Sequence, residues 1–194
     1  MIAARPRPIE ASSLRADLLL ALFLIGFVAI ARLIPHAPNF TPVVAAALFA
    51  GVTLQNRTLA LIVPVAAMLV SDAIIGHDRF GVTLVIYATL ILPALIGIAS
   101  RQFRVSRMFL PAVLSSSLLF FATSNFAVWA FSGMYSHDMA DLAACYVAAL
   151  PFLKNSVAGD LFWSAALFGG AFLVQWASVR FSRSHPTGSL AARS

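Results

Sequence analysis

Charged residues are scarce in this sequence: Lys, Arg, Asp and Glu together form 10% of its 194 residues. A soluble globular domain carries about 25% charged residues, whereas 61% of this chain is hydrophobic. Such a composition excludes a water-soluble fold and predicts an all-α integral membrane protein. The net charge of +6 comes from a single Lys and many Arg scattered between apolar runs. That distribution is typical of membrane topology signals, so we expect no nucleic-acid partner.

Catalytic, metal and disulfide signatures are also missing. The sequence contains no G-x-S-x-G, H-E-x-x-H, P-loop or C-x-x-C motif. Its histidines do not have the spacing of metal ligands. The one cysteine, Cys145, excludes an intrachain disulfide and is expected to be a buried, unreactive thiol. We therefore expect no catalytic residue, no metal and no cofactor.

The apolar residues gather in six runs separated by short polar segments. We expect six transmembrane helices, at 17–34, 41–54, 58–76, 82–100, 108–131 and 157–179. Most of these runs approach or exceed the roughly 18–20 residues that cross a bilayer, but 41–54 is short. We assign residues 1–16 to a disordered cytoplasmic tail, 17–180 to the membrane domain and 181–194 to a second cytoplasmic tail. A cleaved signal peptide is an alternative for the first run, although Arg32 and further spans follow it.

Proline marks several of the boundaries. The prolines within 35–42 predict a loop, with Thr41 as the cap of the next helix and Pro42 in its first turn. Pro64 is expected to break the third run. Residues 132–154 form a mixed segment, with His137, Asp138 and Asp141 in an outer loop before a short apolar stretch that ends at Pro151.

The basic residues predict the orientation. If 41–54 crosses the membrane, ten basic residues lie on one side and only Arg32, Arg79 and Lys154 on the other. Because Arg and Lys are enriched in cytoplasmic loops, both termini are predicted to be cytoplasmic. Without that crossing, the Arg-rich connector 101–107 would lie outside and the asymmetry would disappear.

Polar side chains from separate segments meet at the outer face in this topology, most densely around the start of the last span. Charged groups near the bilayer core usually face a cavity, and an apolar cavity with a few convergent polar groups is the usual form of a small-ligand site. We select seven candidate substrate-binding residues: Asn39, Asp72, Asn125, Trp129, Tyr146, Asn155 and Asp160.

Purely structural interpretations of these residues remain open. Asp72 and Asp160 are also placed to pair with Arg79 and Lys154, respectively. Asn125 is also placed for hydrogen bonding between helices, and Trp129 for the aromatic belt at the membrane surface.

Three pairs of small residues are expected to form helix-packing seams. They are Ala47-xxx-Gly51, Ala165-xxx-Gly169 and Ala166-xxx-Gly170.

Four segments carry a family resemblance: PNFTPVVAAALFAG (38–51), SDAIIG (71–76), FFATSNFAVW (120–129) and CYVAALPFLKNSVAGDLF (145–162). They resemble a bacterial family of small, uncharacterised six-helix membrane proteins. That family is similar to the substrate-binding S components of energy-coupling-factor (ECF) transporters. The resemblance implies a protein of the bacterial inner membrane that captures a vitamin or related micronutrient on the outer side. It also implies partners, namely a shared ECF-type membrane subunit and two ATPases.

One departure from the S components concerns this partner contact. S components usually dock through an Ala-xxx-Ala face on the first helix, but 17–34 offers no such pair. The nearest equivalents, Ala46-xxx-Ala50 and Ala47-xxx-Gly51, lie in the second run. The sequence is therefore also compatible with a transporter that works alone, without an ATPase module. Some solitary S components bind cobalamin through a cysteine, but no matching motif surrounds Cys145.

Three functions follow from these observations. The leading hypothesis is an S-component-like subunit that captures a small nutrient from the outer side. The second is an integral membrane enzyme acting on a lipid or isoprenoid substrate, with Asp72 and Asp160 as acid and base. The third is a membrane scaffold without a ligand.

Overall fold

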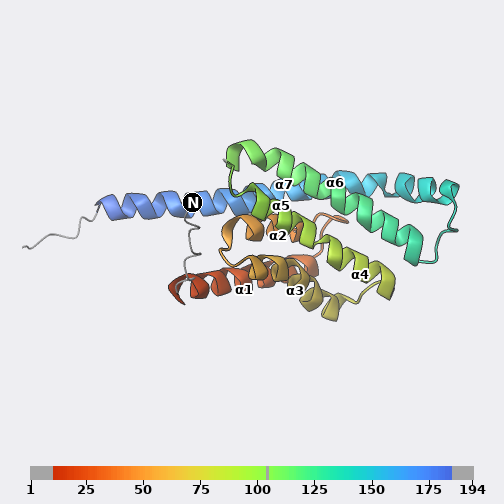
Figure 1. The fold of residues 1–194 in the computed structure, drawn as a ribbon, viewed down its shortest axis with the longest axis horizontal. Helices are drawn as coiled ribbons and strands as arrows, with labels where there is room; N and C mark the ends of the chain where they lie inside the picture. The colour runs from red at the N-terminus through yellow and green to blue at the C-terminus, as the bar shows by residue number, and fades with distance from the viewer. Residues whose placement is uncertain (1–10, 104, 185–194) are drawn as a thin grey trace, which may run out of the picture.

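The computed structural model describes residues 11–103 and 105–184, and within these ranges the only regular secondary structure is helical. This confirms the all-α prediction. The helices are α1 (Ala11–Leu33), α2 (Val43–Thr53), α3 (Arg57–Ile75), α4 (Phe80–Thr89), α5 (Ile91–Ser100), α6 (Val105–Phe131) and α7 (Met139–Ser184) (Figure 1). Residues 11–16 and 181–184, which we assigned to the tails, belong to α1 and α7. The remaining tail residues and Arg104 lie outside the described ranges.

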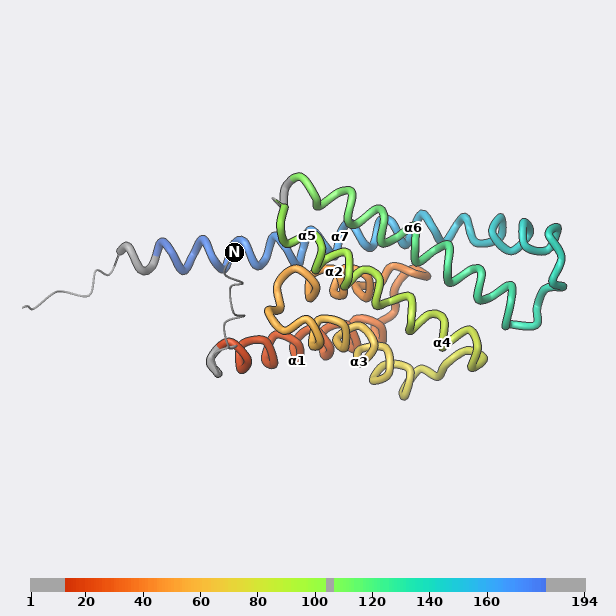
Figure 2. Tube along the Cα trace, in the orientation of Figure 1, coloured from red at the N-terminus to blue at the C-terminus, as the bar shows by residue number. Residues whose placement is uncertain are grey.

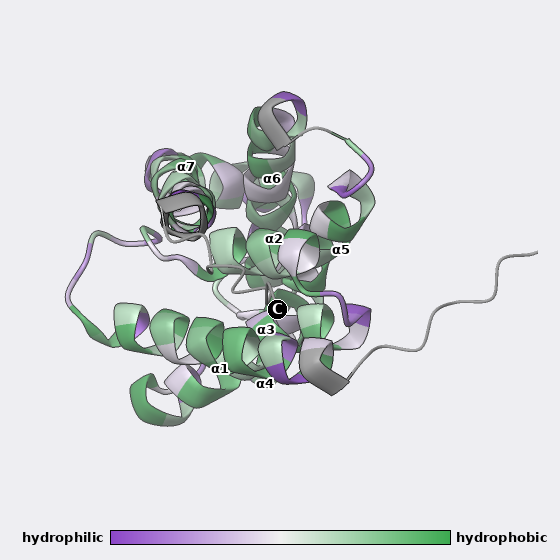
Figure 3. Cartoon of the chain, turned by 90° about the vertical axis from the view of Figure 1, so that its left-hand side faces the viewer, coloured by the Kyte–Doolittle hydropathy of each residue, from purple (hydrophilic) through white to green (hydrophobic). Residues whose placement is uncertain are grey.

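Five helical segments are long and apolar enough to cross a membrane. They are Ser13–Leu33, Arg57–Ile75, Phe80–Ser100, Arg107–Phe131 and Met139–Arg180. Hydrophobic residues occupy most of each helix, and hydrophilic residues concentrate towards helix ends and connections (Figure 3). Large apolar side chains such as Leu19, Ile74 and Phe172 are more than half exposed, as expected for surfaces that face lipid. The prediction of a membrane protein therefore agrees with the fold.

The short helix α2 forms the centre of the bundle. Residues 43–51 are all buried, and α2 contacts α1, α3, α5, α6 and α7 (Figures 1 and 2). Its 11 residues extend about 16 Å, roughly half of a hydrocarbon core. The predicted cap was wrong: Pro42 occupies the N-cap position, and no side chain caps the helix.

Two glycines allow α2 and α5 to cross at close range. A Cβ atom at Gly97 would lie 2.4 Å from the carbonyl oxygen of Leu48, and one at Gly51 would lie 2.2 Å from that of Ala94. The predicted seam at Ala47-xxx-Gly51 is therefore confirmed. By contrast, a Cβ at Gly169 or Gly170 meets no atom within 4 Å. The two predicted seams on α7 are consequently not seams within the described part of the chain.

The fourth apolar run, predicted as one helix at 82–100, is divided at Leu90 into α4 and α5. The third run, where a break was predicted, is one continuous helix. Pro93 has no N–H to donate to the carbonyl four residues earlier, and its ring clashes with that carbonyl. The helix therefore stops at Thr89, whose hydroxyl donates to the carbonyl oxygen of Val85 at 2.7 Å. Pro64 does not break α3, contrary to the prediction, because one missing hydrogen bond is tolerated there.

The helix α7 runs unbroken for 46 residues, where a mixed segment at 132–154 and a separate final span at 157–179 were predicted. Within residues 132–154, only 132–138 lie outside a helix. The side chain of Asp138 accepts a hydrogen bond from the backbone N–H of Asp141 at 2.8 Å, which caps the first turn of α7. The helix then continues through Pro151.

Hydrogen bonds tie several helix ends together at one end of the bundle. The carboxylate of Asp17 accepts hydrogen bonds from the backbone N–H groups of residues 55 and 56, at 3.2 and 2.6 Å. The guanidinium of Arg101 donates to the carbonyl oxygens of Gly51, at 2.7 Å, and Leu54. The start of α1, the turn between α2 and α3 and the end of α5 therefore share one end of the molecule.

Candidate functional site

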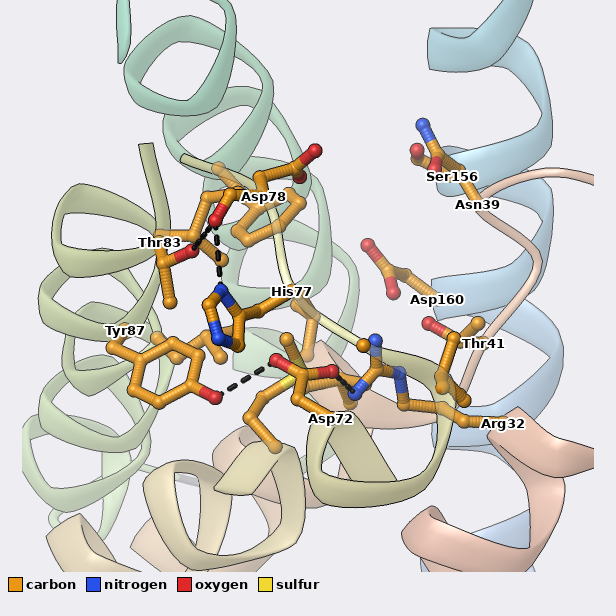
Figure 4. Close-up of a pocket in the computed structure, with 18 residues that line it drawn as sticks. Arg32, Asn39, Thr41, Asp72, His77, Asp78, Thr83, Tyr87, Ser156 and Asp160 are labelled. Atoms are coloured by element: carbon orange, nitrogen blue, oxygen red, sulfur yellow. Dashed lines mark hydrogen bonds and ion pairs between the residues drawn. The ribbon is translucent and has the colours of Figure 1, made fainter. Parts of the chain in front are cut away.

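A cavity of about 540 Å³ lies towards the other end of the bundle (Figure 4). This volume lies within the range of roughly 300–1,000 Å³ that small-molecule pockets occupy. The wall combines α1, the segment 34–42, α2, α3, α4, α6 and α7. Its polar side chains are Arg32, Asn39, Thr41, Asp72, His77, Asp78, Thr83, Tyr87, Ser156 and Asp160. Apolar side chains, including Met68, Ile86 and Phe120, complete it.

An ion pair and a hydrogen bond to the same carboxylate join three helices at one side of the cavity. Nη1 of Arg32, in the last turn of α1, donates to Oδ1 of Asp72 at 2.6 Å and to the hydroxyl of Ser71. The hydroxyl of Tyr87, on α4, donates to Oδ2 of Asp72 at 2.8 Å. Both oxygens of this nearly buried carboxylate therefore have a donor. Arg32, and not Arg79 as the structural alternative suggested, is the ionic partner of Asp72.

A second carboxylate, Asp160, enters the cavity from α7 (Figure 4). Its side chain is 4% exposed, and the hydroxyl of Ser117 on α6 donates to Oδ2 at 2.7 Å. Among the described residues, no side chain donates to Oδ1 and no cation pairs with Asp160. The suggested pairing with Lys154 was therefore wrong. One turn further along α7, the buried hydroxyl of Ser164 has no hydrogen-bond partner within the described chain.

The segment 34–42 supplies a wall of the cavity because it packs against α7. Asn39 has a φ of 62°, a left-handed conformation that asparagine tolerates better than most residues. The side-chain amide of Asn155 donates to the carbonyl oxygen of Pro38 at 3.1 Å. Gly159 allows a close approach, since a Cβ there would lie 3.1 Å from the Cα of Phe40. These contacts hold Asn39 and Thr41 beside the cavity.

The connection between α3 and α4 forms a further part of the wall. Nδ1 of His77 lies 2.9 Å from the backbone oxygen of Asp78, and the hydroxyl of Thr83 donates to the same oxygen at 3.1 Å. The imidazole of His77 projects between Tyr87 and Asp78 (Figure 4). No group of three or more His, Cys, Asp or Glu side chains within the described ranges could hold a metal ion.

Residues 12–184 match the model of a family of unknown function, DUF6580. The chain belongs to this family. A search of curated proteins and a search of solved structures each found no match. The predicted membership of an uncharacterised family is therefore confirmed for this DUF6580 protein.

The seven candidate residues of the DUF6580 protein divide into two groups. Asn39, Asp72 and Asp160 line the cavity, and Asn155 supports its wall. Asn125, Trp129 and Tyr146 are not among the lining residues. The role of all seven in substrate binding stays a prediction.

The residues of the second group lie on α6 and α7, and each donates a hydrogen bond to a backbone oxygen. The side-chain N–H groups of Asn125 and Trp129 donate to the carbonyl oxygens of Phe121, at 2.8 Å, and Ser136, at 3.1 Å. The hydroxyl of Tyr146 donates to the carbonyl oxygen of Ala122 at 2.6 Å. The three side chains therefore hold α6 to itself, to the following loop and to α7. Cys145 is a buried thiol, as predicted.

Sequence reasoning missed three polar residues that shape the cavity of the DUF6580 protein. Arg32 was treated only as a topology signal, and neither Tyr87 nor Ser117 was given a role. A signal existed for each. Arg32 lies at the end of an apolar helix, Tyr87 is the only tyrosine in its run, and Ser117 interrupts a long apolar helix. Polar groups inside a span need a partner, so each residue pointed to a contact with another helix.

Proposed function

We propose that this protein is a substrate-binding, S-component-like subunit that captures a small, vitamin-like nutrient from the outer side of the bacterial inner membrane. The carrying observation is the cavity of about 540 Å³ towards one end of an apolar bundle, with polar side chains from several helices in its wall. Polar side chains at membrane depth cost free energy unless they form hydrogen bonds or ion pairs with one another or with a ligand. The proposal includes an ECF-type membrane subunit and two ATPases as partners.

The proposed topology has six crossings, with the segment 34–42 and α2 together forming the second. An irregular backbone at membrane depth is tolerated where it lines a cavity, as this segment does. Arg57 and Arg101 start α3 and follow α5, respectively, at the end of the bundle opposite the cavity. The preference of Arg for the cytoplasm favours an outward-facing cavity and cytoplasmic termini.

Cysteine labelling tests this orientation. In a Cys145→Ala background, we expect Met134→Cys to react with a membrane-impermeant maleimide on intact cells, because Met134 is 70% exposed in the loop before α7. Gln102→Cys, in the exposed connection between α5 and α6, should react only after the membrane is permeabilised. The reverse labelling pattern would place the cavity on the cytoplasmic side.

Native mass spectrometry tests ligand capture itself. We expect full-length protein, purified in a mild detergent, to retain a small molecule that is released on denaturation. The retained molecule added back to emptied protein should raise its melting temperature, because a ligand that binds only the folded state stabilises it. A protein that carries no molecule and is stabilised by none from a cell extract would contradict the proposal.

The contacts of Asp72 do not favour its role as the acid or base of an enzyme. Arg32 forms an ion pair with one oxygen of Asp72 and Tyr87 donates to the other, so taking up a proton there would sacrifice the ion pair. Asp72 is therefore better suited to a structural role in the cavity wall than to proton transfer. Binding without turnover is the result that we expect.

A further inference from the structure

The charges around the cavity do not balance. Three carboxylates line it, those of Asp72, Asp78 and Asp160. The only Arg or Lys side chain in the wall is Arg32, and its Nη1 is engaged with Asp72 and Ser71. The fixed charges of the described wall are therefore negative overall. Cavities lined by one sign of charge concentrate ligands of the opposite sign.

From this imbalance we infer that the cavity binds a positively charged ligand, and that Asp160 is the residue that pairs with the charge. The inference rests on the proposed capture of a small nutrient and adds the chemical class of that nutrient. Asp160 is the best-placed of the three carboxylates. Asp72 already has two donors, and Asp78 is exposed.

The environment of Asp160 lacks a donor that a ligand can supply. The side chain is 4% exposed, and only the neutral hydroxyl of Ser117 donates to it. Its Oδ1 atom accepts no hydrogen bond from the described residues, and the carboxylate faces the cavity (Figure 4). A carboxylate without a cationic partner is costly in a low-dielectric interior. A cationic N–H group at Oδ1 would supply a charge-assisted hydrogen bond.

The described chain has no cation of its own for this position. Lys154 lies six residues before Asp160 on α7, a spacing that places two side chains on different sides of a helix. Arg32 forms its ion pair with Asp72 and not with Asp160 (Figure 4). No described cation pairs with Asp160, which leaves its carboxylate available to a cationic ligand.

Aromatic side chains add a preference for a flat cation. Tyr87 and Phe120 line the same cavity, and aromatic ring faces attract cations. Asn39 and Thr41 offer further hydrogen-bonding groups. An amidine or protonated amine attached to a ring fits this wall, whereas an anionic ligand would meet three carboxylates.

Three probes of nearly the same shape and different charge test the inference. Benzamidine is cationic, benzamide is neutral and benzoate is anionic. We expect benzamidine to raise the melting temperature of the full-length protein in detergent and to give a measurable affinity by calorimetry. Benzamide and benzoate should bind at least about 10-fold more weakly, because they lack the charge-assisted bond.

Variants assign the effect to Asp160. Asp160→Asn keeps the shape and an acceptor for Ser117 but removes the charge, so benzamidine affinity should fall at least about 10-fold. Lys154→Gln is the matched control, since it removes a charge on the same helix outside the cavity, and should leave affinity unchanged. If Asp160→Asn does not fold, Ser117→Ala retains the carboxylate and should preserve the preference for benzamidine over benzamide.

The possible failures separate the inference from the proposed function. Equal binding of benzamidine and benzamide, no binding of benzamidine, or an unchanged affinity in Asp160→Asn would each overturn the inference. A neutral molecule retained in native mass spectrometry, with the same occupancy in Asp160→Asn, would also overturn it but leave nutrient capture standing. If no molecule is retained and no probe binds, both are wrong.

Discussion

Gly97→Ala is expected to destabilise the protein by about 1–3 kcal/mol, the usual cost of overpacking, and Gly97→Leu to prevent folding. The reason is the crossing of α2 and α5, where a Cβ at Gly97 would lie 2.4 Å from a backbone oxygen of α2. A backbone atom cannot rotate away as a side chain can, so the two helices must separate. Thermal unfolding in detergent, followed by size-exclusion chromatography, measures the loss.

Gly169→Ala is the matched control for this prediction. The substitution is identical, and Gly169 also lies within a helix, but a Cβ there meets no atom within 4 Å. Because alanine favours a helix over glycine by roughly 0.5–1 kcal/mol, Gly169→Ala should leave stability unchanged or raise it. Equal destabilisation by both variants would show that the close crossing is not what Gly97 provides.

Arg32→Met is expected to destabilise the protein by about 3–5 kcal/mol, the usual effect of removing one partner from a buried ion pair. Methionine keeps an apolar side chain of similar length but leaves Asp72 with Tyr87 as its only donor among the residues of this network. The carboxylate would then remain nearly buried without a counter-charge. Unfolding in detergent at several pH values would measure the change.

A double-mutant cycle separates the ion pair from other effects of the substitution. Asp72→Asn removes the charge that Arg32 balances, so Arg32→Met combined with Asp72→Asn should be more stable than Arg32→Met alone. Arg79→Met is a control outside the cavity wall, since Arg79 forms no ion pair within the described chain. If the combined variant loses the sum of the two single losses, the contact between Arg32 and Asp72 contributes little.

The helices themselves were largely predictable from the sequence. A segment that crosses a bilayer must be long and apolar, and its backbone groups must form hydrogen bonds within the segment. Such apolar runs are directly visible in the sequence. Two of the errors concern proline. Pro64 and Pro93 both lie within apolar runs, but only the second separates two helices. Whether neighbouring helices hold a helix together at a proline depends on packing, which periodicity does not contain.

The cavity was predictable only in part. Asn39, Asp72 and Asp160 were found because a polar side chain beside an apolar run is visible in the sequence. The partner of Asp72 was not found, because Arg32 lies 40 residues away along the chain and Arg79 lies closer. Asn125 shows the opposite limit. A polar side chain in a span signals a needed hydrogen bond, but its own helix supplies that bond through Phe121.

The interruption at Leu90 has a consequence for how a ligand would exchange. It divides one membrane span into α5, fixed against α2 at Gly51 and Gly97, and α4, which carries Tyr87 into the cavity wall. A displacement of α4 alone would open the wall, at the cost of the hydrogen bond between Tyr87 and Asp72 and of the packing of α4 on α6. The glycine crossing and the hydrogen bonds of Asp17 and Arg101 would stay in place. Exchange of a ligand past α4 would thus leave the contacts at the opposite end of the bundle unbroken.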